Sequence, residues 1–161
     1  MWLIGTGNMA FHYANVIRYL ETNFITIGRG EANAAKFEQH FGLPVITGGL
    51  AMALEQKEAP ESAIVAVSVD GLFSATKSLI EAGTKRLLVE KPCSISLEEL
   101  IQLREIEAAH DASIFVAYNR RFYAGTKRAQ DIIAEDGGVT SMHMEISERG
   151  FQIAALEQPH H

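Results

Sequence analysis

The sequence contains a single cysteine, Cys93, and no apolar run approaching the roughly 20 residues that a membrane-spanning helix needs. One cysteine excludes an internal disulfide and offers no cysteine cluster for a metal. Positive charge is also scarce, since 14 Lys and Arg residues stand against 20 Asp and Glu residues, for a formal net charge of −6. Proteins that bind phosphate backbones need a basic surface. These absences favour a cytoplasmic protein that binds neither a membrane nor nucleic acid.

The histidines form no metal-ligand pattern either, because the six of them lack a spacing such as H-x-x-x-H. We therefore assign no metal site. The chain has 161 residues, of which 47% are hydrophobic and 21% are charged, as in an ordinary globular protein. That length suffices for one domain with a good core, or for one domain and a fragment of another.

The first ten residues, MWLIGTGNMA, place three small residues directly after a three-residue apolar run. An apolar strand that leads into G-x-G-x-x-A is typical of a dinucleotide-binding βαβ unit. The first glycine makes the turn, the second lets the backbone approach a pyrophosphate, and the third small residue lets helix and strand pack closely. The residues predicted to bind the cofactor here are Gly5, Thr6, Gly7, Asn8, Met9 and Ala10.

Apolar strands then alternate with helical segments, which predicts a doubly wound α/β Rossmann domain with a parallel sheet over residues 1–119. A Ser96-x-x-Glu99 capping box is expected to open one of the helices. After the opening strand, the strands are expected at residues 23–28, 43–49, 62–69, 86–90 and 113–118. The helices are expected at residues 8–21, 31–42, 50–56, 71–83 and 97–110.

The segment that follows differs in character. A helix is expected over residues 120–138, and a half-buried strand over residues 139–148, where Met142, Met144 and Ile146 alternate with polar residues. One helix and one strand cannot form a stable sheet alone. We therefore interpret residues 120–161 as the beginning of an incomplete α+β second domain for substrate binding or oligomerisation.

Ligands of open α/β sheets bind beyond the carboxyl ends of the strands, so the residues that follow each strand are the candidates for the site. The second strand ends in Gly28 and Arg29 and has no acid before Glu31. An NAD site would place an acid there for the ribose hydroxyls, whereas Arg29 suits the 2′-phosphate of NADP. The cofactor prediction is thus NADP, with NAD possible, and the alternative is that Arg29 is a solvated loop residue.

Two further strand ends carry candidates. After the fourth strand, Ser68 is predicted to contact the cofactor, or else Ser68 or Asp70 caps the next helix. After the fifth, the sequence VEKPC sets Glu90 beside Lys91, whose ammonium can bind hydroxyl and carbonyl oxygens or transfer a proton. Both residues are predicted to contact the cofactor, and Lys91 is also predicted to bind the substrate. The alternative is a surface ion pair between these two residues. Cys93 lacks a histidine partner and is interpreted as a packing residue rather than a nucleophile.

The last strand of the series ends in AYNRRF. Asn119 is predicted to contact the cofactor, and Arg120 is predicted to bind an anionic or polyhydroxylated substrate, since arginine offers forked hydrogen-bond donors. The alternative is that these residues cap the following helix and stay solvated.

With GTGNMA, VEKP and YNRRF in this order at successive strand ends, the sequence resembles the Gfo/Idh/MocA family of NAD(P)-dependent oxidoreductases over residues 1 to about 148. The resemblance implies that Gly5, Gly7 and Ala10 form the pyrophosphate turn. It also implies that Arg29 selects the adenosine side and that Lys91 is the catalytic or substrate-positioning lysine.

Members of this family act on sugars, sugar nucleotides, inositols or related polyols. Their larger C-terminal domain supplies an Asp/His pair. His143, on the polar face of the strand predicted over residues 139–148, does not lie in the family's D-x-x-x-H setting and is not assigned to that pair. The resemblance implies an NADP-dependent oxidoreductase acting on a CH–OH group of a small sugar-like substrate, as a homo-oligomer through its second domain.

Two other functions are compatible with the sequence. The first is a non-catalytic NADP-binding module that senses or assembles through the strand of Met142, Met144 and Ile146. The second is a methyltransferase with a Rossmann-like sheet, which Gly28 and Arg29 disfavour because such enzymes carry an acid at the end of the second strand.

Overall fold

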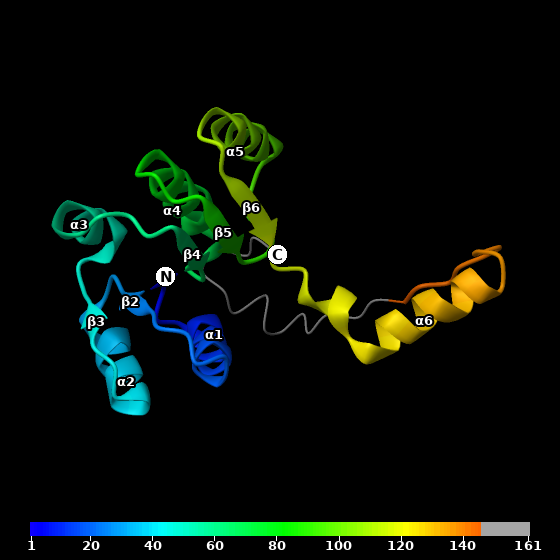
Figure 1. The fold of residues 1–161 in the computed structure, drawn as a ribbon, viewed down its shortest axis with the longest axis horizontal. Helices are drawn as coiled ribbons and strands as arrows, with labels where there is room; N and C mark the ends of the chain where they lie inside the picture. Colours follow the sequence, from blue (N-terminus) through cyan, green and yellow to red (C-terminus); the bar gives the residue numbers. More distant parts are fainter. Residues whose placement is uncertain (146–161) are drawn as a thin grey trace. The chain divides into compact units, whose positions relative to one another are not determined.

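The computed structural model describes residues 1–145. Its contacts divide the chain into two compact units, of which the first is Met1–Ala117. This unit is built on a six-stranded sheet, in which every neighbouring pair is parallel and the order is β3-β2-β1-β4-β5-β6 (Figure 1). That order is the doubly wound Rossmann arrangement, so the predicted fold class is confirmed. The strands are β1 (Trp2–Ile4), β2 (Ile25–Ile27), β3 (Val45–Ile46), β4 (Ser62–Val65), β5 (Arg86–Val89) and β6 (Ser113–Val116).

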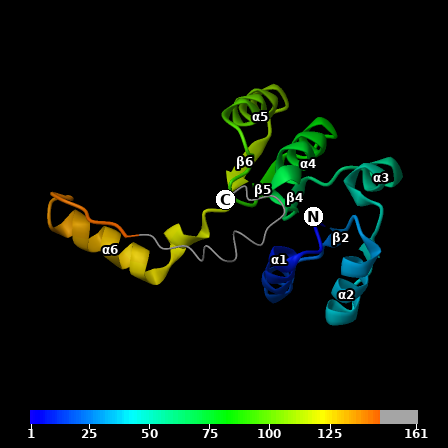
Figure 2. The same ribbon diagram turned by 180° about the vertical axis from the view of Figure 1, so that it is seen from behind.

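Five helices cover the two faces of this sheet. Helices α1 and α2 lie on one side of the strands, and α3, α4 and α5 lie on the other, as Figures 1 and 2 show from opposite directions. The helices are α1 (Asn8–Tyr19), α2 (Glu31–Phe41), α3 (Gly49–Gln56), α4 (Val69–Glu81) and α5 (Leu97–Ala109). Each lies within a few residues of its predicted position.

The strands alternate their side chains between two hydrophobic cores. In β1, Leu3 is fully buried beneath α1 and α2, whereas Trp2 and Ile4 are buried on the opposite face against the cluster that includes α4. This follows from the period of two along a strand. Because both faces are covered, the strand is apolar at every position, as expected for a parallel sheet.

Aromatic side chains join α1 to α2. The ring centroids of Phe11 and Phe37 lie 5.1 Å apart with their planes nearly perpendicular, and those of Phe37 and Phe41 lie 4.5 Å apart. Phe37 is fully buried, which contributes roughly 1.5–3 kcal/mol of hydrophobic stabilisation. The two helices whose first residues follow β1 and β2 are therefore held as one layer.

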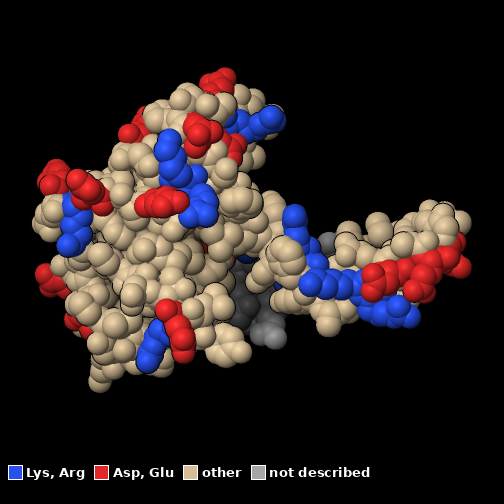
Figure 3. Space-filling model, in the orientation of Figure 1, with Lys and Arg blue, Asp and Glu red and all other residues tan. Residues whose placement is uncertain are grey.

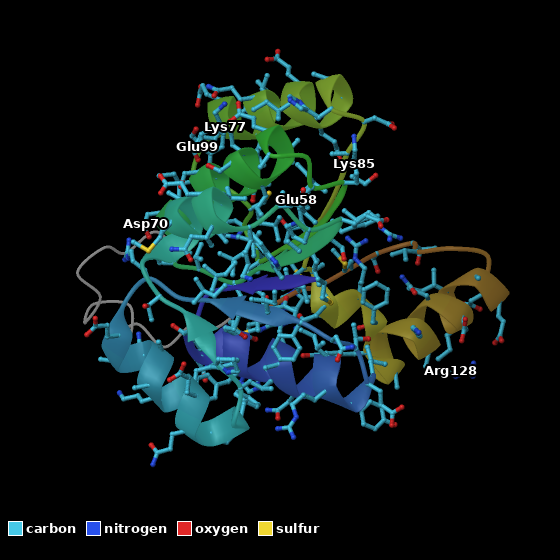
Figure 4. The ribbon with its side chains drawn as sticks, turned by 60° about the vertical axis from the view of Figure 1, so that its left-hand side comes forward. Glu58, Asp70, Lys77, Lys85, Glu99 and Arg128 are labelled. Carbon is cyan, nitrogen blue, oxygen red and sulfur yellow. The ribbon has the colours of Figure 1, made fainter. Side chains whose placement is uncertain are left out.

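Helix α5 is closed at both ends by side-chain hydrogen bonds. The backbone N–H of Glu99 donates to Oγ of Ser96 at 3.2 Å, while Oε2 of Glu99 accepts from the N–H of Ile95 at 3.2 Å. The predicted Ser96 cap is thus confirmed, although the glutamate reaches one residue further back than in the usual capping box. At the other end, Nζ of Lys85 donates to the His110 carbonyl oxygen at 2.6 Å; Glu99 and Lys85 are labelled in Figure 4.

Surface charges of the first unit are mixed in sign. On the face drawn in Figure 3, positive side chains of this unit lie near negative ones. Two ion pairs in this unit are Arg86–Glu61, at 2.8 Å, and Lys77–Glu81 on successive turns of α4. The side chains of Arg86 and Glu61 are largely exposed and those of Lys77 and Glu81 are partly exposed, and surface pairs of this kind contribute about 0–1 kcal/mol each. The pairs therefore do little to stabilise the fold.

The second unit starts at Tyr118. A 3-10 turn, η1 (Asn119–Phe122), precedes helix α6 (Ala124–Glu135). The prediction of one helix over residues 120–138 is wrong at its start, because the backbone of Tyr123 is extended, with ψ 141°. The prediction that the helix ends before two glycines is correct, since Gly137 and Gly138 have φ of +81° and +117°.

The strand predicted over residues 139–148 is not formed in its described part, residues 139–145, and residues 146–148 lie outside the described residues. Met142 and Met144 are 78% and 67% exposed, so this segment has no half-buried face. An alternating pattern forms a strand only when a neighbouring strand accepts its hydrogen bonds. Among residues 118–145 there is no such neighbour.

Candidate functional site

The turn after β1 can be made only by glycine. Gly5 has φ +119°, and a Cβ atom at this residue would lie 2.2 Å from the carbonyl oxygen of Ala66 and 2.8 Å from its carbonyl carbon. Its N–H donates to the Ile27 carbonyl at the end of β2, at 2.8 Å. Ala66 directly follows β4, so Gly5 brings the ends of β1 and β4 together. This is where the strand order reverses, the place at which doubly wound sheets bind their ligands.

Helix α1 begins at this point with an open N-terminus. Gly7 occupies the N-cap position, no side chain caps it, and the first turn contains no acidic residue. The position of a Cβ atom on Gly7 has no described atom within 4 Å, so the approach to the helix end is clear. The first backbone N–H groups of a helix and its dipole favour an anion. Asn8 and Met9, both exposed, lie in this first turn.

Two further residues of the motif are buried and set the helix close to the sheet. Ala10 is fully buried in one core cluster with Leu3 and Ala66, so a larger side chain would push α1 off the strands. Thr6 is 8% exposed. Its Cγ2 atom would lie 2.9 Å from a Cβ atom on Gly28. The structure thus brings the whole predicted segment, residues 5–10, to one end of β1.

Gly28, which the sequence analysis gave only as the end of the second strand, makes contacts to three segments beside the candidate site. Its N–H donates to the Ile46 carbonyl at 2.9 Å, and its own carbonyl accepts from the N–H of Gly49 at 3.0 Å. A Cβ atom there would lie within 3.2 Å of the side chains of both Thr6 and Val45. The ends of β2 and β3 and the start of α3 therefore meet at Gly28. The sequence signal was the pair of glycines that flank Arg29.

Arg29 follows directly and is exposed. Its Cγ atom would lie 3.9 Å from a Cβ atom on Gly49, the first residue of α3. On its other side, α2 starts after an N-cap glycine, Gly30, that carries no side-chain cap. No hydrogen bond or ion pair of Arg29 is found among residues 1–145. A guanidinium between two uncapped helix starts forms a positively polarised corner that suits an anion.

Ser68 stands at the N-cap position of α4, but its hydroxyl makes no capping hydrogen bond, and only its carbonyl accepts, from Gly71 N–H at 2.8 Å. The side chain is exposed at the carboxyl end of β4. The alternative that Ser68 caps the next helix is therefore correct for its position at the N-cap, but the Ser68 hydroxyl does not form the capping hydrogen bond. Asp70, labelled in Figure 4, lies in the first turn of α4, where the helix dipole favours a negative charge.

Glu90 and Lys91, which directly follow β5, lie in opposite environments. Glu90 is 8% exposed and accepts a hydrogen bond from the hydroxyl of Tyr13 on α1, with 2.6 Å between the oxygens. Lys91 is exposed, and none of the ion pairs among the described residues includes it or Glu90. The alternative of a surface Glu90–Lys91 ion pair is therefore wrong, because the carboxylate is turned inward.

Backbone hydrogen bonds hold this turn on the sheet. The N–H of Glu90 donates to the Val65 carbonyl at 3.0 Å, and the N–H of Cys93 donates back to the Glu90 carbonyl at 2.9 Å. The Lys91–Pro92 peptide bond between them is cis. Lys91 is thus presented at the carboxyl end of β5, beside β4, whose end meets the Gly5 turn.

Cys93 itself is a packing residue. Its side chain is 2% exposed within the core that includes α4 and α5. Burial raises the pKa of its thiol, and the negative charge of Glu107 raises it further. A thiol that stays protonated and buried does not act as a nucleophile.

Asn119 and Arg120 belong to the second unit and are described within it. Both lie in η1 and are exposed. The Arg120 carbonyl accepts a hydrogen bond from the Thr126 hydroxyl at 3.0 Å, which ties η1 to the first turn of α6, and the neighbouring Arg121 guanidinium lies 6.0 Å from the centre of the Tyr118 ring. Among residues 118–145 the side chain of Arg120 makes no hydrogen bond or ion pair, and it is available for an anionic group.

Over the described residues, no group of three or more His, Cys, Asp or Glu side chains is arranged to hold a metal ion. Within the same residues, none of the helices combines the length and the apolar character needed to cross a membrane.

The sequence profile of GFO_IDH_MocA, described as an oxidoreductase family with an NAD-binding Rossmann fold, matches residues 1–118. Among curated proteins no sequence matches.

Three solved structures illustrate the shared fold. The WlbA dehydrogenase from Chromobacterium violaceum, in complex with NADH and UDP-GlcNAcA, is 17% identical with a TM-score of 0.75; the match covers 84% of this chain and 39% of that one. GenD2 from gentamicin A biosynthesis, in complex with NAD, is 22% identical with a TM-score of 0.76, covering 88% and 40%. Biliverdin reductase from Synechocystis sp. PCC 6803, with biliverdin and NADP+, is 19% identical with a TM-score of 0.70, covering 83% and 42%. The chain thus spans about two fifths of the length of these relatives.

Proposed function

We propose a function from the premise that this chain belongs to the Gfo/Idh/MocA oxidoreductase family, whose profile matches residues 1–118. The protein is an NADP-dependent oxidoreductase that acts on a CH–OH group of a sugar, sugar-nucleotide or polyol-type substrate. The observation that carries the proposal is the turn of Gly5 and Gly7, which sets an uncapped helix start at the reversal point of the sheet. A nicotinamide dinucleotide, when bound, supplies the hydride chemistry.

The first unit fits the pyrophosphate of such a cofactor. Gly7 leaves its surroundings open, so the backbone can come close to a diphosphate. The free N–H groups at the start of α1, near Asn8 and Met9, then donate to its oxygens. The buried Ala10 keeps the helix against the strands and so fixes where these donors point.

Arg29 is proposed to select NADP over NAD. The 2′-phosphate distinguishes the two cofactors, and it adds negative charge beside the ribose. Arg29 is free of ion pairs in the described chain and lies beside the uncapped starts of α2 and α3. Glu31, the first residue of α2, lies in the same region. Its negative charge repels a phosphate and therefore limits how much more tightly NADPH can bind than NADH.

Lys91 is proposed to bind the substrate oxygen at the reacting carbon and to hold or move its proton. Its ammonium is exposed and has no carboxylate partner among residues 1–145. Ser68 and Glu90 flank the same edge of the sheet on the cofactor side. Asn119 is proposed to contact the cofactor and Arg120 an anionic part of the substrate, each through its own exposed side chain.

The substrate class rests on the family rather than on the fold. The WlbA structure holds UDP-GlcNAcA and the Synechocystis structure holds biliverdin, so relatives with the same fold take very different substrates. We therefore propose sugar-like substrates as a class to be screened with the full-length protein, and we expect Lys91→Met to abolish turnover while sparing cofactor affinity.

The test is a parallel titration with NADPH and NADH, followed by quenching of Trp2, the only tryptophan, which lies in β1 ahead of Gly5. We expect NADPH to bind at least about 10-fold tighter, a difference of about 1.4 kcal/mol. Arg29→Ala should remove that preference. The matched control is Lys36→Ala, which deletes an exposed cation within α2. If neither nucleotide binds, or if Arg29→Ala leaves the ratio unchanged, the assignment is wrong.

A second candidate is a non-catalytic NADP-binding module that assembles through residues after 118. The exposure of Met142 and Met144 favours it, because exposed methionines suit a protein-binding surface. Both candidates bind NADPH. Activity distinguishes them, because the module should oxidise no NADPH with any of the sugar-like substrates screened. Association distinguishes them as well: the module should self-associate in sedimentation experiments, and Met142→Ser and Met144→Ser should weaken that association.

A further inference from the structure

One hydrogen bond connects the two halves of the proposed site. The Tyr13 hydroxyl, on the helix that starts at the pyrophosphate turn, donates to Oε1 of Glu90 at 2.6 Å. Glu90 is the residue immediately before Lys91, at the carboxyl end of β5. The contact thus joins residues 77 positions apart in the sequence, and both lie in the first unit.

The direction of Glu90 follows from the period of the strand. Leu88, two residues earlier, packs against the cluster beneath α1 and α2, whereas Leu87 and Val89 belong to the core on the other face. Glu90 continues the Leu88 side, which is why its carboxylate meets α1. At 8% exposure this carboxylate has lost most of its water. A buried carboxylate is costly unless a donor satisfies it, and Tyr13 is the donor here.

Tyr13 is suited to remain that donor. Burial, the hydrogen bond to Glu90 and the charge of Glu90 all raise the pKa of its phenol above the ordinary value of 10.0. The phenol therefore keeps its proton at physiological pH. It holds the carboxylate without neutralising it, so the negative charge stays on the α1 side of the sheet.

Lys91, in contrast to Glu90, is exposed and unpaired among residues 1–145. Its side chain is exposed, and the ion pairs of the described chain do not include it, although a carboxylate is its neighbour in sequence. An ion pair would raise the pKa of the ammonium and occupy the donors that a substrate oxygen needs. The free state of Lys91 thus depends on where the Glu90 carboxylate is held.

We propose that Tyr13 is a positioning residue: its hydroxyl retains the Glu90 carboxylate on the α1 face and thereby keeps the Lys91 ammonium unpaired for a substrate oxygen. The inference rests on the proposed role of Lys91. It assigns to α1 a second task beyond the pyrophosphate, because the same helix also controls the charge next to the lysine.

The experiment measures how fast Lys91 is acetylated by limiting acetic anhydride at pH 8, with the modified peptides quantified by mass spectrometry relative to Lys36, an exposed lysine on α2. Neither cofactor nor substrate is needed. A failure of nucleotide binding therefore remains separate from a failure of this inference. The variants are Tyr13→Phe, Glu90→Gln and the double variant. As a matched control, Tyr19→Phe removes the hydroxyl of a tyrosine on the same helix that is 86% exposed.

In Tyr13→Phe the carboxylate loses its donor and turns towards Lys91, so we expect Lys91 acetylation to slow at least about threefold, since a nearby opposite charge shifts a pKa by a unit or more. Adding Glu90→Gln should restore the rate to within twofold of the wild type. Glu90→Gln alone and Tyr19→Phe should leave it unchanged.

An unchanged rate in Tyr13→Phe would overturn the proposal, as would a slower rate that Glu90→Gln does not restore, because the hydroxyl would then act only on general stability. Glu90→Gln alone provides a separate check that does not need Tyr13→Phe to fold. A change above threefold in that variant would show that the carboxylate already acts on Lys91 in the wild type, against the proposal.

Discussion

Gly5 and Gly7 belong to one motif but are constrained by different things, and alanine substitutions should separate them. At Gly5 the added Cβ atom would lie 2.2 Å from the Ala66 carbonyl oxygen. That segment cannot retreat freely, because the Ala66 N–H donates to the Ile4 carbonyl at 2.8 Å. At Gly7 the same atom would meet nothing within 4 Å, and the backbone, with φ −84°, suits any residue.

The magnitudes follow from these two geometries. In Gly5→Ala, the positive φ of +119° costs about 1–2 kcal/mol, and forcing a methyl group against backbone costs about 1–3 kcal/mol more. We expect the free energy of unfolding to fall by about 2–5 kcal/mol. Gly7→Ala replaces the N-cap glycine of α1 with a poorer capping residue and should cost less, about 1 kcal/mol or below. The methyl group would instead occupy the open space at the start of α1 and weaken NADPH binding at least about 10-fold.

Urea unfolding followed by the fluorescence of Trp2 measures the first quantity, and NADPH titration of the folded variants measures the second. The decisive comparison is the crossed pattern, with stability lost in Gly5→Ala and affinity lost in Gly7→Ala. The reasoning is refuted if Gly5→Ala is as stable as the wild type, or if Gly7→Ala binds NADPH as tightly.

Three further predictions test the surroundings of the site. Ser96→Ala should lower the free energy of unfolding by about 1 kcal/mol, since it removes the N-cap of α5, whereas Ser74→Ala, on the exposed face of α4, should change it by less than half as much in the same urea experiment. Because the pKa of the buried Cys93 thiol is raised, its reaction with a disulfide reagent at pH 8 should be slow in the native protein and fast in urea; a fast native reaction would contradict its burial. The pKa of Tyr13 is raised in the fold, so its contribution to stability is present below pH 10 and lost as the pH rises above it, and Tyr13→Phe should flatten that alkaline loss in pH-dependent thermal unfolding.

Local signals in the sequence predicted most of the first unit. Strands buried on both faces form nearly continuous apolar runs, so β4 (Ser62–Val65), which is apolar from Ala63 onward, stood out without tertiary information. Helix ends were equally local. Gly42 adopts φ +66° at the end of α2, as a C-terminal glycine should, and Ser96 caps α5. These features depend on residues within one or two turns of each other.

The errors arose where a pattern depends on partners elsewhere in the chain. Residues 139–145 alternate like a strand, yet the described part of their unit has no strand to pair with them. The helix predicted from residue 120 fails at Tyr123, where the extended backbone separates η1 from α6. Periodicity alone does not reveal such a break.

By itself, the sequence determined the doubly wound sheet, the glycine turn at its centre and the position of Lys91 at a strand end, because each depends on residue type and short-range spacing. Only the tertiary structure decided that Gly5 lies against Ala66 and that Gly28 joins Thr6 to the start of α3. It also decided that Glu90 is buried against Tyr13 rather than paired with Lys91. These contacts connect segments that are distant in sequence, and the packing of strands and helices alone sets which of them meet.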